Sequence, residues 1–314
     1  MSSQTFFKLF PPPKFLDMPY AGLDISDDAI HCLEYSHTFH GLSIHRYGMK
    51  ELPSGVIVGG EIEDKKILSE IITSLVKELK IYSVKVSLPE EKIYLFKTDV
   101  PNASEEEIRQ NVEFKLEENV PISPAESIFF FDLIPNSLSA SVSVAPRELV
   151  MSYLEVLKSA GLTVVSFEAQ PRAITRSLIS HGSTETQIIV HIMNQKTGIY
   201  VICGEVVCFT STVVLGKETL LSNSKTFIEE LKKHLVQVLS YWVLHGQGTK
   251  ISHIIFSGYA SLTNSLVEHC SPDIPVEIGK VWQNAFSHEN YIPPISYEDS
   301  LDYAVAIGLA MPTT

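Results

Sequence analysis

The stretch PNASEEEIRQNVEFKLEENVPISP, residues 101–124, decides how the middle of this chain folds. Ser104 and Glu107 have the S-x-x-E spacing of a capping box, and acids fill the first turn, where the helix dipole favours negative charge. Apolar residues then recur at every fourth position, at Ile108, Val112, Leu116 and Val120. These signals predict a single amphipathic helix that ends before Pro121, because proline has no N–H to continue the ladder.

Strand patterns flank this helix on both sides. The sequence VKVSLPEEKIYLFKTDV, residues 84–100, predicts a strand pair before it, and SIFFFDLI and SASVSVA, within residues 127–145, predict a hairpin after it. The helix is expected to bury its apolar stripe on the sheet that these strands form. We therefore expect an inserted α+β subdomain.

A strand–turn–strand–strand pattern occurs twice in the rest of the chain. Residues 20–51 contain it first, with a polar turn at residues 25–28, and residues 187–214 repeat it, with a polar turn at residues 194–197. Amphipathic helix patterns follow each copy, the longest at residues 225–245. The duplication predicts an α/β fold of two related lobes that face a shared cleft.

These patterns give an expected domain organisation. Its parts are an N-terminal extension at 1–17, a first lobe at 18–83, the inserted subdomain at 84–160, an inter-lobe segment at 161–184 and a second lobe at 185–314.

Composition limits the classes of function. The 314 residues carry a net charge of −13 without any run of Lys and Arg longer than a pair, so nucleic acid is not an expected partner. No apolar run reaches the ~20 residues that span a bilayer and no signal peptide is visible, which predicts a cytoplasmic protein. The four cysteines lie in apolar runs without metal-ligand spacing, and we expect buried free thiols rather than disulfides.

Three polar turns after strand ends are candidates for the walls of the cleft. Loop N–H groups in such turns can surround phosphates, but turns without a ligand use the same residue types. Asp24 is the sharpest candidate, because an acid at the end of an apolar strand faces either a cleft or its own turn. The candidate nucleotide-binding residues are Asp24, Ser26, Asp27, Asn194, Lys196, Ser257 and Gly258.

Several segments together resemble the PilM family of type IV pilus assembly proteins, actin-like relatives of the cell-division protein FtsA. They are GLDISDDAIHCLEY (22–35), the strands and helix of residues 84–134, FEAQPRAITRSLI (167–179) and YEDSLDYAVAIGLAM (297–311). The resemblance covers nearly the whole chain from about Met18 and is most specific in the inserted subdomain, which actin lacks. It implies a two-lobed actin-like fold, a duplicated ribonuclease H-like architecture, with a reduced second lobe.

The resemblance also implies a function. Members of this family bind ATP between the lobes and grip the cytoplasmic N-terminal tail of the inner-membrane protein PilN, in a groove between the inserted subdomain and the first lobe. The protein would then be a cytoplasmic adaptor, peripheral at the inner face of the membrane. The groove would be lined by the strands of residues 84–100 and the helix of residues 105–120, with Val86, Leu88, Tyr94, Phe96 and Glu113 as partner-binding residues.

Three departures from the family pattern fall on the nucleotide site. His191-Ile192-Met193 stands where the family has Asp-x-Gly, the glycine-rich adenosine motif is reduced to residues 257–260, and a small subdomain between residues 214 and 225 is largely missing. Without that acid and glycine, a magnesium–phosphate group loses its orienting ligand and its close backbone contact. We expect ATP binding to be weak or lost, with no catalytic residues.

Two other classes of function stay open. One is an ATP-binding or ATP-hydrolysing protein on the same fold, which would need acids and glycine loops in the cleft. The other is a filament-forming protein or the cytoplasmic part of a type II secretion component. The absence of a membrane-spanning run argues against the secretion component, and the shortened second lobe against the filament.

Overall fold

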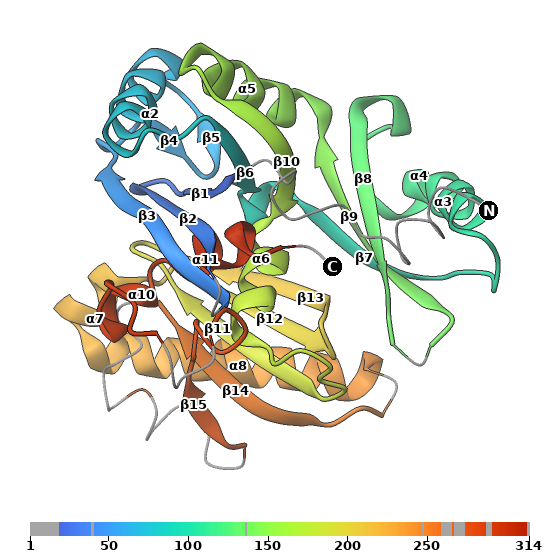
Figure 1. Ribbon diagram of the computed structural model, residues 1–314. Coiled ribbons are helices and arrows are strands. Elements are labelled where there is room, and N and C mark those ends of the chain that lie inside the picture. Colours follow the sequence, from blue (N-terminus) through green and yellow to red (C-terminus); the bar gives the residue numbers. More distant parts are fainter. Residues whose placement is uncertain are drawn as a thin grey trace.

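Two five-stranded sheets form two lobes, and a three-stranded sheet lies beside them (Figure 1). This is a computed structural model. It describes residues 19–38, 41–135, 137–246, 248–258, 266, 274–286 and 291–312. None of the helices in these ranges is long and apolar enough to span a membrane.

The first lobe contains strands from both sides of the inserted subdomain. Its elements are β1 (Ala21–Ile25), β2 (Ala29–Thr38), β3 (Gly41–Glu51), β4 (Ile57–Val58), β5 (Glu61–Ile62), α2 (Lys65–Leu79), β6 (Ser83–Leu88), α5 (Arg147–Ser159) and β10 (Thr163–Ala169). Its main sheet has the order β10-β6-β1-β2-β3, in which β1 runs antiparallel to β2 and parallel to β6. The apolar stripes of α2 and α5 pack into one core with β1 and β6, through side chains such as Leu68, Ile72 and Leu157.

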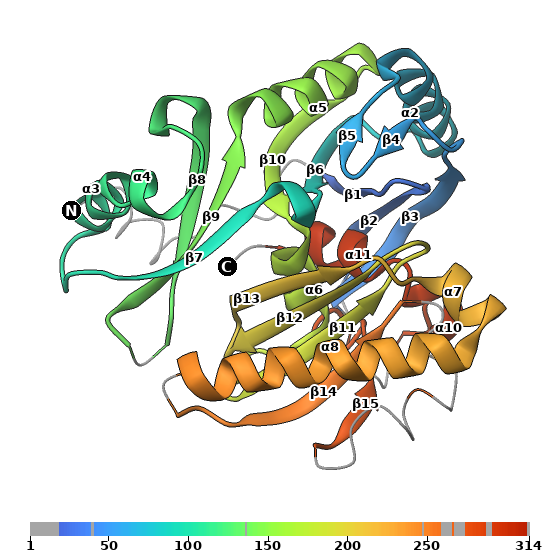
Figure 2. The same cartoon turned by 180° about the vertical axis from the view of Figure 1, so that it is seen from behind.

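The second lobe repeats this topology. Its elements are β11 (Thr186–Ile192), β12 (Thr197–Cys203), β13 (Val206–Val213), α7 (Lys217–Ser222), α8 (Ser224–His245), β14 (Ile251–Ser257) and β15 (Val276–Ile278). The sheet order β13-β12-β11-β14-β15 matches the first lobe, with an antiparallel meander followed by parallel strands. Helix α8 lies across this sheet (Figure 2) and buries the stripe predicted from its sequence, from Phe227 to Trp242.

Two helices join the lobes, α6 (Gln170–Leu178) and α11 (Ala304–Ala310), the second preceded by the short α10 (Tyr297–Ser300). They pack against each other and against β1 because glycines allow close approach. A Cβ atom added at Gly308 would lie 1.8 Å from the carbonyl oxygen of Ala173, and one added at Gly22 would lie 2.1 Å from that of Ala306. The small residues of the C-terminal segment therefore form the contact between the lobes.

The inserted sheet has the order β7-β9-β8 and consists of β7 (Tyr94–Asp99), β8 (Ser127–Leu133) and β9 (Ser139–Pro146). The predicted single helix is two helices, α3 (Glu105–Phe114) and α4 (Leu116–Asn119). The break falls at Lys115, whose Nζ donates to Asp99 O at 2.7 Å and to Thr98 Oγ1 at 2.9 Å. The apolar stripe is nevertheless continuous, and all four of its members are buried against the sheet.

The predicted strand pair of residues 84–100 is split between two sheets. β6 lies in the middle of the first-lobe sheet, and β7 begins the inserted sheet after a 3₁₀ turn at Glu90–Lys92. Helix α5 also packs into the first-lobe core. We therefore propose narrower bounds for the inserted subdomain, from Tyr94 to Pro146.

Candidate functional site

Asp24 lies at the carboxyl end of β1, on the floor of the cleft between the lobes. It is 4% exposed, and its Oδ1 accepts hydrogen bonds from Ser87 Oγ at 2.6 Å and Gln170 Nε2 at 3.5 Å. Burial raises the pKa of the Asp24 carboxyl to about 6, although the bond from Ser87 opposes the rise. These partners lie on β6 and α6, so Asp24 does not serve mainly to cap its own turn.

Ser26 and Asp27 hold the turns around the cleft. Ser26 Oγ donates to Ala29 O at 2.9 Å and closes the β1–β2 turn. The two carboxylate oxygens of Asp27 accept N–H bonds of 3.0 Å from Gly59 and Gly60. Both glycines have positive φ, 55° and 78°, so Asp27 fixes the strained turn between β4 and β5. Its carboxylate is thereby engaged inside the protein.

Asn194 and Lys196 come from the β11–β12 turn of the second lobe. Asn194 Nδ2 donates to Glu218 Oε1 at 3.1 Å, and Lys196 forms an ion pair with Glu91, which lies in the 3₁₀ turn before β7. Burial lowers the pKa of Lys196, but the carboxylates of Glu91, Asp27 and Glu90 together outweigh it and the net shift is upward. The positive charge of Lys196 is therefore already neutralised within the protein.

His191 lies on the cleft wall of the second lobe, and Ser257, its neighbour on β14, and Gly258 lie behind it. Gly258 has φ +90°, and an added Cβ atom would meet Ile192 O at 2.0 Å, so the turn itself requires glycine. Burial lowers the pKa of His191 to about 4, so its ring is neutral at pH 7. His191 Nδ1 and Ser257 Oγ have no hydrogen-bond partner within the described ranges. Residues 259–260, the rest of this expected turn, lie outside those ranges.

Two adjoining cavities contain most of the predicted residues. One of 340 Å³ is lined by Asp24, Ser26, Asn194 and His191, and the next, of 320 Å³, by Asp27, Asn194 and Lys196. Ser257 and Gly258 line neither cavity.

Charge makes the first cavity a poor match for a polyphosphate. Its lining includes the acids Asp24, Asp28, Glu51 and Asp302, against the cation Lys217. Burial also raises the pKa of the Asp28 carboxyl. Among the described residues, no group of three or more His, Cys, Asp or Glu side chains is placed to hold a metal ion.

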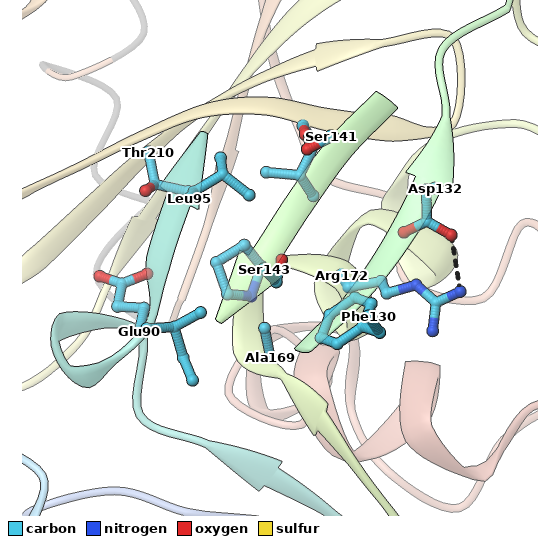
Figure 3. A pocket seen from close by; sticks show the side chains of 12 residues that line it. Glu90, Leu95, Phe130, Asp132, Ser141, Ser143, Ala169, Arg172 and Thr210 are labelled. Carbon is cyan, nitrogen blue, oxygen red and sulfur yellow. Dashed lines mark hydrogen bonds and ion pairs between the residues drawn. The ribbon is translucent and has the colours of Figure 1, made fainter. Parts of the chain in front are cut away.

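A second candidate site lies on the inserted sheet. The three-stranded sheet has two faces, because successive side chains of a strand alternate. One face carries Phe96, Phe129 and Val142 and is filled by α3 and α4. The opposite face carries Leu95 and Phe130 and borders a pocket (Figure 3). Helices α3 and α4 therefore cover the face opposite this pocket, although Lys115 between them lines a groove together with β7.

The pocket is closed by residues from three parts of the fold. The inserted sheet contributes Leu95 and Phe130, α6 contributes Arg172, and β13 contributes Thr210. Arg172 pairs with Asp132 at 2.8 Å and its guanidinium carbon lies 5.1 Å from the Phe130 ring centroid. Sequence reasoning did not select these residues, because each belongs to a different sequence segment.

A larger groove of 640 Å³ continues from this pocket, since both are lined by Leu95 and Thr210. Its wall includes a stack of three rings, with centroid distances of 4.8 Å from Phe209 to Tyr241 and 4.3 Å from Tyr241 to His245. Strands β7 and β13 are both edge strands of their sheets and meet at this groove. Unpaired strand edges are templates for an added strand.

The structure places the predicted partner-binding residues apart. Val86 and Leu88 are buried in the core of the first lobe, on a strand that is paired on both sides. Tyr94 is 38% exposed on β7, and Phe96 lines the larger groove. Glu113 is exposed on α3, which covers the other face of the sheet. Of the five, the two β7 residues lie where a partner has access to a strand edge.

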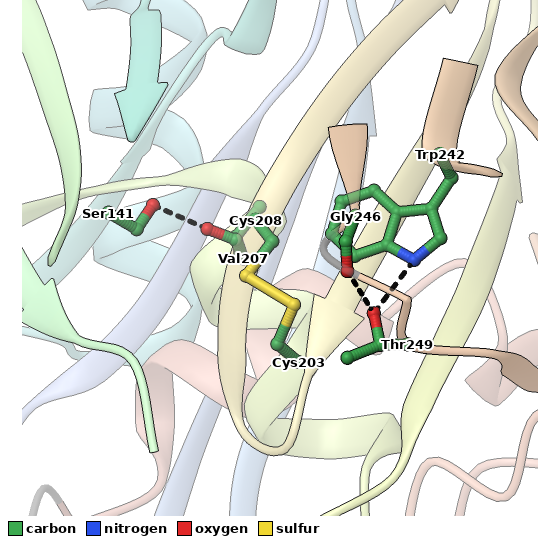
Figure 4. Close-up of a disulfide and its surroundings, with 7 residues drawn as sticks. All are labelled: Ser141, Cys203, Val207, Cys208, Trp242, Gly246 and Thr249. Carbon is green, nitrogen blue, oxygen red and sulfur yellow. Dashed lines mark hydrogen bonds between the residues drawn. A yellow bond between two sulfur atoms is a disulfide. The ribbon is translucent and has the colours of Figure 1, made fainter. Parts of the chain in front are cut away.

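The expectation of free thiols is wrong for two of the cysteines. Cys203 and Cys208 form a disulfide across the β12–β13 hairpin (Figure 4), because a register shift between Val201 and Ile202 brings them together. Beside the bridge, Ser141 of β9 donates a hydrogen bond to the Val207 carbonyl. Cys32 is buried and unbridged among the described residues, and Cys270 lies outside them.

One family model and several solved structures match this chain. The family described as type IV pilus assembly protein PilM matches residues 22–224. A structure of a PilM–PilN type IV pilus biogenesis complex matches with a TM-score of 0.78 and 18% identity, covering 93% of this chain and 98% of that chain. No curated protein matches this chain.

Two further structures are similar to this chain. The ethanolamine utilization protein EutJ from Carboxydothermus hydrogenoformans has a TM-score of 0.52 and 14% identity, covering 96% of this chain and 90% of that one. The cytoplasmic domain of EpsL from the type II secretion system of Vibrio cholerae has a TM-score of 0.49 and 13% identity, covering 91% and 94%. The fold is the actin-like α/β fold.

Proposed function

Because the chain belongs to the PilM family of type IV pilus assembly proteins, we propose that it is an adaptor that binds the N-terminal tail of a PilN-like inner-membrane protein. The similar solved complex contains PilM together with PilN. Binding such a tail would hold the protein at the inner face of the membrane. In this proposal, ATP binding in the cleft between the lobes contributes little to the function.

The free edge of β7 carries this proposal. An extended peptide added to a sheet edge gains main-chain hydrogen bonds, and pockets for alternate side chains give specificity. The edge of β7 has the small pocket at Phe130 on one side and the aromatic groove at Tyr241 on the other. A tail along β7 would therefore contact both the inserted subdomain and the second lobe. We place Tyr94 and Phe96 in this docking surface.

Val86 and Leu88 are buried in the first-lobe core and lie outside the docking surface. They belong to β6, whose continuation through the 3₁₀ turn sets where β7 begins. Glu113 lies on the exposed side of α3, which covers the opposite face of the sheet. A tail on β7 therefore makes no contact with Glu113.

A pair of variants tests this placement. Leu95→Arg introduces a bulky charge where the pocket and the groove meet, and Glu113→Lys reverses a charge on the far side of the sheet. Fluorescence anisotropy with a labelled peptide of the PilN-like tail should show binding weakened at least about tenfold by Leu95→Arg, as for a buried hot spot. Glu113→Lys should bind like the parent protein.

If Glu113→Lys weakens binding and Leu95→Arg does not, the tail binds on the face of the sheet that α3 covers. Circular dichroism and unfolding curves of both variants separate a lost contact from a lost fold. A parent protein that does not bind the peptide at all contradicts the adaptor proposal. The open alternative, an ATP-binding or ATP-hydrolysing protein, would then need nucleotide in the cleft.

A further inference from the structure

Glu90 is a buried acid on the wall of the small pocket. It follows β6 in the 3₁₀ turn that leads to β7, and its side chain lines the pocket opposite Phe130 and Arg172 (Figure 3). The residue is 5% exposed. Its Oε1 accepts a hydrogen bond of 2.7 Å from Thr212 Oγ1 of β13. Its Oε2 is buried and has no hydrogen-bond partner among the residues that the structure describes.

No cation among the described residues forms a direct ion pair with Glu90, although Lys196 lies near enough to oppose the rise in its pKa. Both nearby cations pair with other acids, Lys196 with Glu91 and Arg172 with Asp132. The Tyr200 hydroxyl lies near Glu90 and opposes the rise in the pKa of its carboxyl. Within the described ranges, however, the Tyr200 hydroxyl makes no hydrogen bond of proper geometry. Burial raises the pKa of Glu90 to about 7. A buried carboxylate normally has a counter-charge and a donor for each oxygen.

We propose that Glu90 selects the partner tail by accepting a hydrogen bond from a cationic nitrogen of that tail. The nitrogen is either the terminal ammonium group or the ammonium head of a Lys side chain. This inference rests on the proposed adaptor function and specifies the chemistry of its docking surface. A cation supplies both the hydrogen-bond donor that Oε2 lacks and a positive charge that offsets the cost of burying the carboxylate. A neutral donor supplies only the hydrogen bond.

The shape of the pocket fits a charged head on an apolar stem. Its free volume of 20 Å³ holds one group of about the size of a water molecule or an ammonium head. The walls leading to it include the apolar side chains of Ile93, Leu95 and Phe130. Aliphatic stems of long cationic side chains pack along such surfaces while their heads reach polar partners. The rest of the tail would continue along β7 into the larger groove.

Binding should release a proton near neutral pH. A cation beside Glu90 lowers the pKa of its carboxyl, so that a proton held by part of the free protein is lost. The other titratable groups around Glu90 are Glu91, Lys196 and Tyr200, with Asp132 and Arg172 across the pocket. Glu91 and Lys196 pair with each other and Asp132 pairs with Arg172, so Glu90 is the group whose charge the ligand changes.

Calorimetry at neutral pH in two buffers of different ionisation enthalpy tests the proposal. The probe is the synthetic tail peptide of the PilN-like protein, added to the full chain. The parent protein should give a buffer-dependent heat from proton release. Glu90→Gln should bind at least about tenfold more weakly and release no proton, because the amide cannot neutralise a cation. Glu113→Gln, the matched control on the far side of the sheet, should still release the proton.

Altered peptides identify the nitrogen. If an acetylated N-terminus abolishes the effect of Glu90→Gln, the donor is the terminal ammonium group. If replacing Lys by norleucine abolishes it, the donor is that side chain. If all these peptides still depend equally on Glu90, a neutral donor or a water molecule occupies the site and the cation proposal is overturned. Equal binding by Glu90→Gln and the parent protein overturns it too.

A small probe separates this inference from the proposed function. Butylammonium chloride, compared with butanol, should shift the amide resonances of Leu95 and Thr212 in the parent protein but not in Glu90→Gln. That result without any peptide binding would leave Glu90 as a cation site and contradict the adaptor function. Peptide binding without any dependence on Glu90 would leave the adaptor function and overturn the Glu90 proposal. Failure of both probes overturns both.

Discussion

The carboxylate of Asp24 accepts a hydrogen bond of 2.6 Å from the hydroxyl of Ser87, which links the neighbouring parallel strands β1 and β6 under the cleft. Burial raises the pKa of Asp24 from 3.8 to about 6. Between these values the folded protein holds a proton that the unfolded chain has lost. The contribution of Asp24 to the free energy of unfolding therefore falls as pH rises from about 4 to about 6.

Asp24→Asn should remove this penalty. The amide oxygen can still accept from Ser87, and no charge is buried. The free energy of unfolding should rise by up to about 3 kcal/mol above pH 7, the value of a two-unit shift, and the gain should vanish near pH 4. Urea unfolding at both pH values measures it. Asp27→Asn serves as control, because it weakens the bonds to Gly59 and Gly60 and should destabilise the protein. A gain that is equal at both pH values would contradict burial of charge as its cause.

Nucleotide binding should be weak or absent. The first cavity is lined by four acids and by His191, which is neutral because burial lowers its pKa to about 4. Repulsion between these acids and a polyphosphate opposes binding, and Lys196 is already paired with Glu91. Titration with a fluorescent ATP analogue and magnesium, followed by anisotropy, should show no saturable binding up to millimolar concentration.

Two comparisons interpret that titration. Asp24→Ala should give the same flat curve as the parent protein, and an actin-like ATPase should bind the analogue under the same conditions. Tight binding that Asp24→Ala abolishes would mean that the cleft still works. The alternative function, an ATP-binding or ATP-hydrolysing protein, would then be the better interpretation.

Local signals in the sequence predicted the elements well. The stripe from Phe227 to Trp242 predicted α8 because every member faces one core, and the repeated strand–turn–strand–strand pattern predicted β11 to β13. The break at Lys115 was not predictable, because residues 105–120 keep one continuous apolar stripe and contain no glycine or proline. The separation of β6 from β7 was missed because membership of a sheet is decided by distant strands.

Some residues of the candidate sites were likewise predictable from the sequence and others were not. Asp24 was predictable, because an acid at the end of an apolar strand is costly wherever that strand lies in a core. Asp27 was chosen for its place in the turn, but the structure shows its carboxylate on Gly59 and Gly60. Glu90 was missed because nothing in residues 89–92 marks it as buried. Its burial comes from β13, which follows it by more than a hundred residues.

The disulfide should make the protein sensitive to reductant. In the chain-entropy model, a bridge across five residues contributes about 2 kcal/mol. Reductant should lower the free energy of unfolding of the parent protein by about that amount and leave Cys203→Ser unchanged. A thiol count on denatured protein should show two more thiols after reduction. An unchanged count would show that Cys203 and Cys208 do not bridge in solution.

The contact between the lobes should depend on the lack of a side chain at Gly308. The glycine lies on α11 with negative φ, so conformation alone does not require it. An added Cβ atom would lie 1.8 Å from the backbone oxygen of Ala173 on α6, and backbone cannot move aside without separating the helices. Gly308→Ala should therefore lower the free energy of unfolding by about 1–3 kcal/mol or more, because an extra methyl group in a packed core usually costs that much. Gly48→Ala is the matched control, because its Cβ would meet the flexible Leu79 side chain at 3.2 Å, and it should change stability by less than half as much. If chemical unfolding shows equal losses for the two variants, the close approach of α6 and α11 is not what holds the lobes together.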